Sequence, residues 1–427
     1  MRRRHRPPNV LLVVLDSVRA ANCSLYGFPR PTTPFLESFA EDATTYAQAR
    51  APSNWSLPSH VSLFTGLETH DHRVTVHDRL RPGHTVFEAL ADRKYETGLF
   101  TENGFLTGHD AGLDAAFDAV VDVPDAHDDR YDTTDLNPGP DGYYYADRFL
   151  DWSAALDGPW AACVNLMDAH RPFEPRPGFD CWGDARAREI QSALDPRWEW
   201  TFHAGDRPYW QLRALESLYD GGIRQADAIV ERIVGVLRRR DALDDTLVVI
   251  CGDHGDGFGE PGRLDGEPPA VSHIVPMHEA LLHVPLVVRP PGGGDGDRVH
   301  DPAALTRFPD VALGHATGEP PSRGFAAETV VATKQPVTAD LRDRFERRCD
   351  TAEPYVEPSR AVYTNARGRA VRKRYYWGRD AGTCLVHGPE AVGRVRPADR
   401  GAVDEAFDEP TADVREPLSE PSVTDEV

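Results

Sequence analysis

Short apolar runs recur along the chain, and each run ends in polar residues. They are Asn9–Leu15, Thr97–Thr101, Trp160–Met167, Thr246–Cys251 and Val284–Arg289. Apolar runs of about four to eight residues with polar boundaries are typical of strands that are buried on both faces. We therefore expect these five segments to be strands of one central sheet.

Segments with helical periodicity lie between these runs, at Thr33–Asp42, Thr85–Arg93 and Leu215–Arg240. Apolar residues recur along one helical face of the last segment, at Ile223, Ala226, Ile229, Ile233, Val236 and Leu237. The alternation of strands and helices predicts an α/β domain with a mainly parallel sheet flanked by helices. In such sheets, ligands bind beyond the carboxyl ends of the strands.

The pattern changes after about residue 320, so we expect a catalytic domain at 1–320 and a small α+β subdomain at 321–398. Its expected elements are short extended segments in an antiparallel sheet and one helix: Ala361–Thr364, Arg374–Trp377, Cys384–His387 and Thr338–Arg348. Residues 399–427 hold ten acidic and two basic residues. We expect them to form a disordered acidic tail, because this composition offers little surface to bury.

The charge of the chain is strongly negative: 47 basic against 69 acidic residues give −22, and only Lys94, Lys334 and Lys373 are lysines. Such a surface is typical of proteins that work in concentrated salt, where screening removes the self-repulsion. A GC-rich genome alone would explain arginine in place of lysine, but it explains the aspartate surplus less well. The charge also argues against nucleic acid as a partner.

No apolar run reaches the length of about 18 residues that a membrane span needs. The basic residues 1–8 lead directly into a short apolar run rather than into a secretory signal, so we expect a cytoplasmic protein. None of the six cysteines forms a C-x-x-C pair. The sequence therefore predicts neither a zinc ribbon nor a disulfide framework.

Residues that can carry chemistry follow several of the predicted strands. Asp16 follows the first run, and the adjacent Asp253 and His254 follow the fourth. A carboxylate and an imidazole at a strand end, with glycine beside them, can bind one cation. Ser56 begins a predicted helix, where it could equally be a helix cap, and His170 follows the third run.

The order of these segments resembles the sulfatase branch of the alkaline phosphatase superfamily, most closely its sulfatase-like archaeal members. The resemblance runs from Asn9 to about Gly292. It rests on seven collinear blocks: NVLLVVLDSVRA, LYGFPRPTTPFLESFAED, APSNWSLPSHVSLFTG, NLMDAHRPF, YDGGIRQADAIVERIVGVL, TLVVICGDHGDGFGE and HEALLHVPLVVRPPG. It implies an alkaline-phosphatase-like fold with a divalent cation at its active site.

The resemblance also implies a role for each matching residue. Asp16, Ser56, Asp253 and His254 would bind one divalent cation (Ca²⁺, Mg²⁺ or Mn²⁺), with Ser56 as the nucleophile. His170 would bind the substrate, and His273 would bind the transferred oxyanion or protonate the leaving group. His60, in place of the arginine of the family signature, would donate to the same oxyanion. A second cation, held by Asp168 with His170 and His273, is the less favoured alternative.

Four departures from the family pattern bear on the reaction. Ser17 stands where many sulfatases have a second aspartate, His60 replaces an arginine, and Thr101–Gly104 contains no counterpart of a family lysine. Ser56 replaces the cysteine that becomes formylglycine. A plain hydroxyl is closer to what phosphatase, phosphodiesterase and phosphoglycerol-transferase relatives use.

We therefore expect a metal-dependent hydrolase that cleaves a sulfate or phosphate ester. The expected substrate is a small anionic ester or a sulfated or phosphorylated glycan. The alternative within the superfamily is a phosphodiesterase or a phosphoglycerol-transferase-like enzyme that acts on glycan or lipid-type substrates. The alternative of another class is an inactive descendant that binds a metal or an anion.

Overall fold

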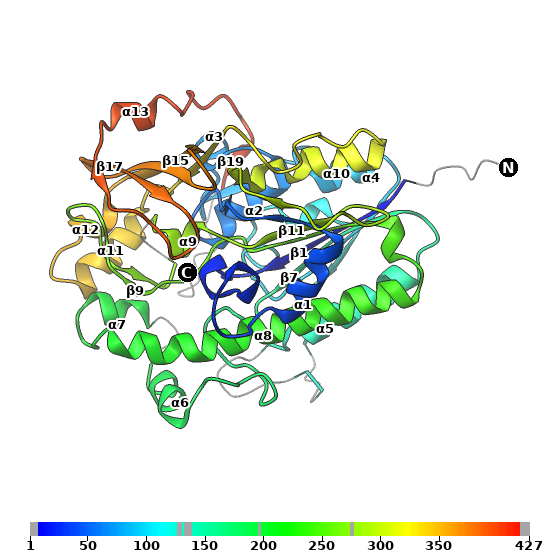
Figure 1. Ribbon diagram of the computed structural model, residues 1–427, viewed down its shortest axis with the longest axis horizontal. Coiled ribbons are helices and arrows are strands. Elements are labelled where there is room, and N and C mark those ends of the chain that lie inside the picture. Colours follow the sequence, from blue (N-terminus) through cyan, green and yellow to red (C-terminus); the bar gives the residue numbers. More distant parts are fainter. Residues whose placement is uncertain (1–6, 126–129, 132–138, 195–197, 274–276, 419–427) are drawn as a thin grey trace.

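An eight-stranded sheet forms the centre of the molecule in the computed structural model, which describes residues 7–125, 130–131, 139–194, 198–273 and 277–418 (Figure 1). In spatial order its strands are β12 (Arg298–Val299), β2 (Thr44–Tyr46), β11 (Leu286–Arg289), β8 (Thr246–Cys251), β1 (Asn9–Leu15), β7 (Trp160–Leu166), β5 (Glu96–Phe100) and β6 (Ala119–Val121). All five predicted strands are therefore confirmed as parts of one sheet.

The sheet is mainly parallel. β1 runs parallel to β7 and β8, and β5 runs parallel to β7 and β6. β11, by contrast, pairs antiparallel with both β8 and β2. The carboxyl ends of β1, β5, β7 and β8 consequently meet at one edge of the sheet.

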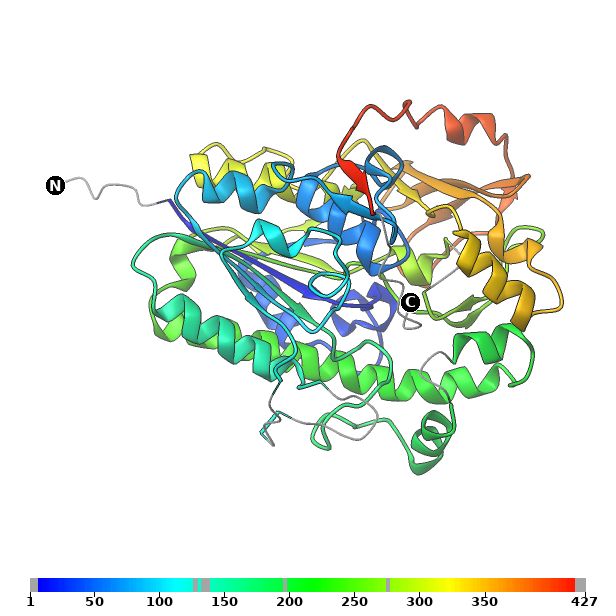
Figure 2. The same ribbon diagram turned by 180° about the vertical axis from the view of Figure 1, so that it is seen from behind.

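Helices cover both faces of the sheet (Figures 1 and 2). Alternate residues of β1 point to opposite faces of the sheet. Leu11 and Val13 pack in the core that contains α5 (Gly142–Ala154) and α8 (Trp210–Arg239). On the opposite face, the core contains apolar residues of α2 (Ser56–Thr65), α4 (Val86–Ala91) and α10 (Phe308–Thr317). Because β1 is buried on both faces, it is apolar from Val10 to Leu15 rather than alternating.

The predicted C-terminal antiparallel sheet is also confirmed. It has five strands in the order β14 (Thr329–Thr333), β15 (Ser359–Asn365), β16 (Val371–Trp377), β17 (Asp380–Val386) and β18 (Arg396–Pro397). The helix α11 (Ala339–Arg348) lies where the sequence predicts one. A domain boundary near residue 320 stays a prediction.

Short elements connect these layers. The helices are α1 (Pro34–Phe39), α3 (Thr69–His72), α6 (Ala185–Ser192), α7 (Glu199–His203), α9 (Glu279–Leu282), α12 (Glu353–Val356) and α13 (Gly401–Asp404). The strands are β3 (Ala49–Arg50), β4 (Asp78–Leu80), β9 (Phe258–Glu260), β10 (Ala270–Val271), β13 (Ala303–Ala304) and β19 (Arg415–Pro417). No helix within the described ranges combines the length and apolar character that a bilayer crossing requires.

A buried ion-pair cluster attaches the C-terminal sheet to the segment that leads to Ser56. Glu279 lies 2.9 Å from Arg50 of β3 and 3.0 Å from Lys373 of β16, and it accepts a 2.6 Å hydrogen bond from the hydroxyl of Tyr363. These four side chains are at most 4% exposed. A buried charge needs such partners, so the cluster fixes how the two sheets lie relative to each other.

The predicted disordered tail is wrong for residues 399–418. Val403 of α13 is fully buried against Val331, Val362 and Tyr376 of the C-terminal sheet. Further along, β19 pairs antiparallel with β4. The neighbouring Val414 packs in the core that contains residues of α2, α4 and α10. The acidic composition was misleading because strand pairing uses backbone groups and needs only a few apolar anchors. Residues 419–427 lie outside the described part of the chain.

Deleting residues 399–427 should lower the free energy of unfolding by about 3 kcal/mol, since Val403 and Val414 lose their burial. Val403→Ala alone should cost about 1.5 kcal/mol. Both are read from urea unfolding curves. Glu409→Ala, at an exposed position of the same segment, is the control and should leave the curve unchanged. An unchanged curve after the deletion would contradict the packing of this segment.

Candidate active site

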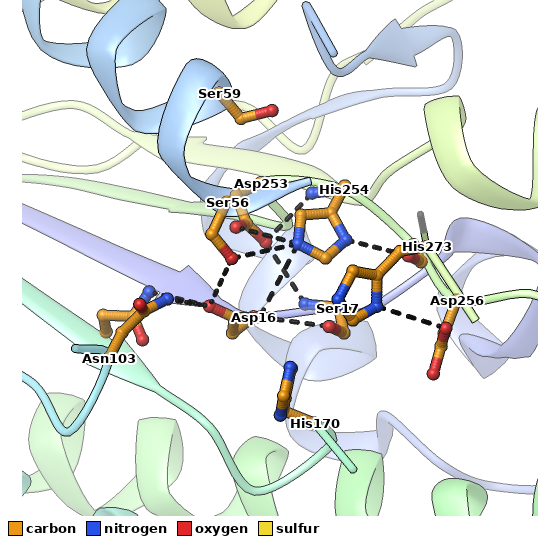
Figure 3. Close-up of polar contacts among 12 residues, drawn as sticks. Asp16, Ser17, Ser56, Ser59, Asn103, His170, Asp253, His254, Asp256 and His273 are labelled. Carbon is orange, nitrogen blue, oxygen red and sulfur yellow. Dashed lines mark hydrogen bonds and ion pairs between the residues drawn. The ribbon is translucent and has the colours of Figure 1, made fainter. Parts of the chain in front are cut away.

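Side chains from several strand ends and one helix start converge at the carboxyl edge of the sheet (Figure 3). Asp16 directly follows β1, Asp253 and His254 follow β8, and Ser56 is the first residue of α2. His170 and Asn103 come from the segments after β7 and β5. The fold therefore brings together residues that are up to 238 positions apart in the chain.

The four predicted metal-binding residues form one buried cluster. Ser56 Oγ lies 3.1 Å from His254 Nε2 and 3.4 Å from Asp16 Oδ2. His254 Nε2 lies 3.4 Å from Asp253 Oδ2 and 3.8 Å from Asp16 Oδ1. Ligand atoms of Asp16, Asp253 and His254 all lie within 4.8 Å of one another.

The hydrogen bonds of the cluster leave ligand atoms available for a cation. His254 Nδ1 donates to the Gly255 carbonyl at 2.9 Å, so Nε2 keeps its lone pair and faces the carboxylates. Asp253 Oδ1 accepts from the backbone N–H groups of Ser17 and His254. Asp253 Oδ2 is buried and has no hydrogen-bond partner. An orphaned carboxylate oxygen beside an imidazole nitrogen fits a divalent cation.

The electrostatics of the cluster point the same way. Burial would raise the pKa of Asp16, but His254, His170 and two further imidazoles outweigh it and lower that pKa to about 2. Burial and the neighbouring Asp16 raise the pKa of Asp253. Burial would lower the pKa of His254, but Asp253 and Asp16 raise it above its ordinary value. A cation between the two carboxylates would relieve their mutual repulsion.

Ser17 does not take the place of a second metal-binding aspartate. Its hydroxyl donates to Asp16 Oδ1 at 3.0 Å and its backbone N–H donates to Asp253 Oδ1 at 3.2 Å. Its φ of 61° is in the left-handed region, which is uncommon for a residue other than glycine. Ser17 thus orients both carboxylates instead of adding a third.

Two asparagines also hold Asp16, and the sequence analysis did not assign them this role. Asn103 Nδ2 donates to Asp16 Oδ2 at 2.9 Å, and Asn165 Nδ2 lies 3.3 Å from the same oxygen. Asn103 stands in the stretch where the family has a lysine. The available signal was its position after a predicted strand, the same signal that identified Asp16.

His60 does not have the predicted role of a donor to the substrate oxyanion. Its Nδ1 donates to the Ser56 carbonyl at 2.9 Å, one turn back along α2, and its Nε2 lies 3.2 Å from the Asn165 amide. The ring is fully buried. Both ring nitrogens therefore have partners within the protein, and the Nδ1 hydrogen bond connects His60 to the first residue of α2.

His170 and His273 lie beside the cluster. The two ring centroids are 5.3 Å apart, and the ring of His273 lies 4.6 Å from that of His254. Burial lowers the pKa of His170 to about 4 and that of His273 well below its ordinary value. Figure 3 shows His170 directed toward Asp16 and His273. Both histidines are thus placed to meet a substrate at the cluster, as neutral imidazoles.

Asp168 does not lie with His170 and His273. The geometry therefore does not support a second cation held by these three residues. Its Oδ1 accepts from Gln225 of α8 at 2.6 Å and from the Gly142 N–H of α5 at 3.3 Å. The carboxylate near His273 is instead Asp256, whose Oδ1 lies 3.4 Å from His273 Nδ1. Burial raises the pKa of Asp256 to about 6, although Arg171 and His170 oppose this.

Comparison with known proteins gives a family and a fold. A family model described as sulfatase matches residues 8–318. Arylsulfatase K of Mus musculus is 21% identical over 329 residues, covering 67% of this chain and 57% of the relative. N-acetylgalactosamine-6-O-sulfatase of Bacteroides thetaiotaomicron is 23% identical over 348 residues, covering 66% of this chain and 68% of the relative. The chain thus spans little more than half the length of the first of these relatives.

Among solved structures, the phosphonate monoester hydrolase of Agrobacterium radiobacter superposes with a TM-score of 0.62 at 19% identity. The superposition covers 89% of each chain. At this level of identity the likeness establishes a shared fold.

Proposed function

The chain belongs to the sulfatase family, and we propose that it is a metal-dependent hydrolase that cleaves a sulfate or phosphate ester with Ser56 as the nucleophile. One observation carries this proposal. Ser56 Oγ lies 3.1 Å from His254 Nε2 and 3.4 Å from Asp16 Oδ2, within the cluster that fits a divalent cation. A hydroxyl needs such activation, because its own proton is held too tightly at neutral pH.

Asp16, Asp253, His254 and Ser56 would hold the cation, which supplies charge neutralisation for the ester and favours the deprotonated hydroxyl. Ser56 Oγ attacks the sulfur or phosphorus atom, the alcohol of the ester leaves, and water then releases the group from Ser56. Ser56 and Leu57 are the first two residues of α2, and the backbone N–H groups of a helix start can bind charged ester oxygens. His170 and His273 lie beside the cluster, and as neutral imidazoles they would bind the ester oxygens through a ring N–H group.

The hydroxyl at residue 56 favours phosphorus chemistry as the second candidate. An unmodified serine would form a sulfo-enzyme that is difficult to release, whereas a plain hydroxyl resembles the nucleophile of phosphatase and phosphodiesterase relatives. A phosphodiesterase or a transferase to a glycan or lipid-type acceptor is therefore the alternative within the same site. The named relatives act on sulfate groups, and one of them carries a sugar in its name, which supports a sulfated glycan as the substrate.

A screen of turnover tests the proposal. Aryl sulfate, aryl phosphate and bis-aryl phosphate would be compared at molar KCl with Mn²⁺, Mg²⁺ or Ca²⁺. We expect metal-dependent cleavage of at least one ester. Metal binding without any turnover would instead favour the inactive, anion-binding descendant.

We further infer, from the net charge of −22, a salt-adapted protein; closeness to archaeal members of the family and a cytoplasmic location stay predictions. The net charge of −22 should make the midpoint of thermal unfolding rise between about 0.1 and 3 M KCl, as the Debye length falls from roughly 10 Å to below 3 Å. Calorimetry at constant pH measures this. A midpoint that is flat or falls would contradict salt adaptation.

A further inference from the structure

The described residues around the cluster carry more negative than positive charge. Asp16, Asp253 and Asp256 are carboxylates within the site, and a divalent cation would offset only two of them. His60 stands in place of the arginine of the family signature, and the stretch Thr101–Gly104 has no counterpart of the family lysine; the polar atoms of His60 and Asn103 bond within the protein. An anionic ester needs a further positive partner for its oxygens.

Arg171, the residue after His170, has a guanidinium close to His273. Its Nε donates to Ser272 Oγ at 3.2 Å, and the same Oγ lies 3.3 Å from His273 Nδ1. The guanidinium therefore lies beside Ser272, whose hydroxyl also contacts His273. Its side chain is 9% exposed.

The partners that hold Arg171 are unusual. Glu199 of α7 is fully buried, lies 3.4 Å from Arg171 NH2, and neither of its carboxylate oxygens has a hydrogen-bond partner. A buried carboxylate without hydrogen bonds is costly. Ser272 has a φ of 51°, in the left-handed region that costs a residue other than glycine strain. Strain and uncompensated burial of this kind concentrate at functional sites.

We propose, on the basis of the ester-cleaving function above, that Arg171 binds the charged oxygens of the substrate and that Glu199 and Ser272 hold its guanidinium in place. A planar guanidinium carries a permanent positive charge and donates N–H groups in a fixed geometry that suits sulfate and phosphate oxygens.

A structural role for Arg171 is the competing explanation, since it would only neutralise Glu199. Arg171→Gln alone does not separate the two roles, because it leaves Glu199 buried and unpaired and so destabilises the fold. The double variant Arg171→Gln/Glu199→Gln removes both charges. Its thermal midpoint should return toward that of the wild type, while its binding of anions should not.

Calorimetric titration of the metal-loaded protein with inorganic sulfate at constant ionic strength measures this binding without turnover. We expect affinity to fall about tenfold to a hundredfold in the double variant, the loss of a charge-assisted hydrogen bond. Arg176→Gln is the matched control: Arg176 lies in the same segment and pairs with the buried Asp141, on the side of α5. It should keep wild-type affinity.

Wild-type sulfate affinity in the double variant would overturn the proposal and leave Arg171 as a counter-ion of Glu199. An equal loss in Arg176→Gln would also overturn it, because the effect would not be specific. Arg171→Lys serves if the double variant does not fold: it keeps the charge but lacks the planar fork, and unchanged affinity there would contradict the proposal. Because sulfate binding is measured apart from cleavage, an absence of turnover would count against the proposed function alone.

Discussion

Ser56→Ala is expected to remove nearly all turnover, on the order of 10⁴-fold or more, as when a serine nucleophile is deleted from other enzymes. The reason is geometric: Ser56 Oγ is the hydroxyl that lies beside His254 Nε2 and Asp16 Oδ2 at the cluster. Metal content should partly survive, since Asp16, Asp253 and His254 remain. The measurement is kcat with the best ester from the screen, together with metal analysis of the same sample.

Ser59→Ala is the matched control for this variant. Ser59 is buried on the same helix, less than one turn away, but its hydroxyl bonds to the Ser53 carbonyl, and Figure 3 shows it directed away from the cluster. We expect Ser59→Ala to keep most of its turnover. If Ser56→Ala kept it as well, Ser56 would not be the nucleophile; the cap position of α2 is Trp55, so Ser56 does not cap this helix either.

The mass of the peptide that contains Ser56 tests the state of the nucleophile. We expect the unmodified mass, because His60 stands in place of the arginine of the family signature. In modified sulfatases an aldehyde replaces the nucleophile's side chain. Oxidation of the Ser56 hydroxyl to that aldehyde would appear as a loss of about 2 Da. Such a loss would favour sulfate over phosphate chemistry.

Asp253→Asn is expected to lose the bound cation, with affinity reduced by more than about 100-fold and turnover reduced with it. Changes to residues that merely support a metal ligand cost about 10- to 100-fold, so a ligand should cost more. Asp253 Oδ2 is the buried oxygen without a hydrogen-bond partner, and it lies 3.4 Å from His254 Nε2. Metal analysis after dialysis measures the change.

Stability without metal gives a second measurement on the same variant. In the metal-free protein, Asp16 and Asp253 are buried side by side. Burial is the largest cause that raises the pKa of Asp253, and the negative charge of Asp16 is the second. Metal-free Asp253→Asn should therefore be more stable than the metal-free wild type, by on the order of 1 kcal/mol, because one of two like charges is gone. With metal present, the wild type should be the more stable of the two proteins.

Asp168→Asn is the matched control for Asp253→Asn. Asp168 is also an aspartate after a central strand and is partly buried, but it bonds to Gln225 and Gly142. It should keep its metal. Equal metal content in Asp253→Asn and the wild type would contradict the assignment of the cluster as a cation site.

The sequence by itself determined the central sheet and the residues at its carboxyl edge. Apolar runs such as Asn9–Leu15 and Thr246–Cys251 are unambiguous because strands buried on both faces are apolar throughout. Parallel strands end at the same edge, so polar residues that follow them, Asp16 and Asp253 among them, meet without any knowledge of packing. The family motifs added Ser56 and the two histidines near the cluster.

Only the tertiary structure decided where each side chain points once it leaves its strand. His60 and Asp168 lie beside the expected site in sequence, yet the first bonds to the backbone of its own helix and the second turns toward α5 and α8. Backbone turns after a strand set these directions, and the spacing of residues does not encode them. The residue types of His60 and Asp168 would have suited either direction.

The pairing of distant segments was likewise decided only by packing. Glu199 meets Arg171, Asn103 meets Asp16, and β19 at residues 415–417 meets β4 at residues 78–80. A local pattern reports burial and periodicity along one element, whereas these contacts depend on how two elements far apart in the chain are brought together. For that reason the acidic C-terminal segment looked unstructured by composition, although its backbone completes a two-stranded sheet and its two buried valines anchor it.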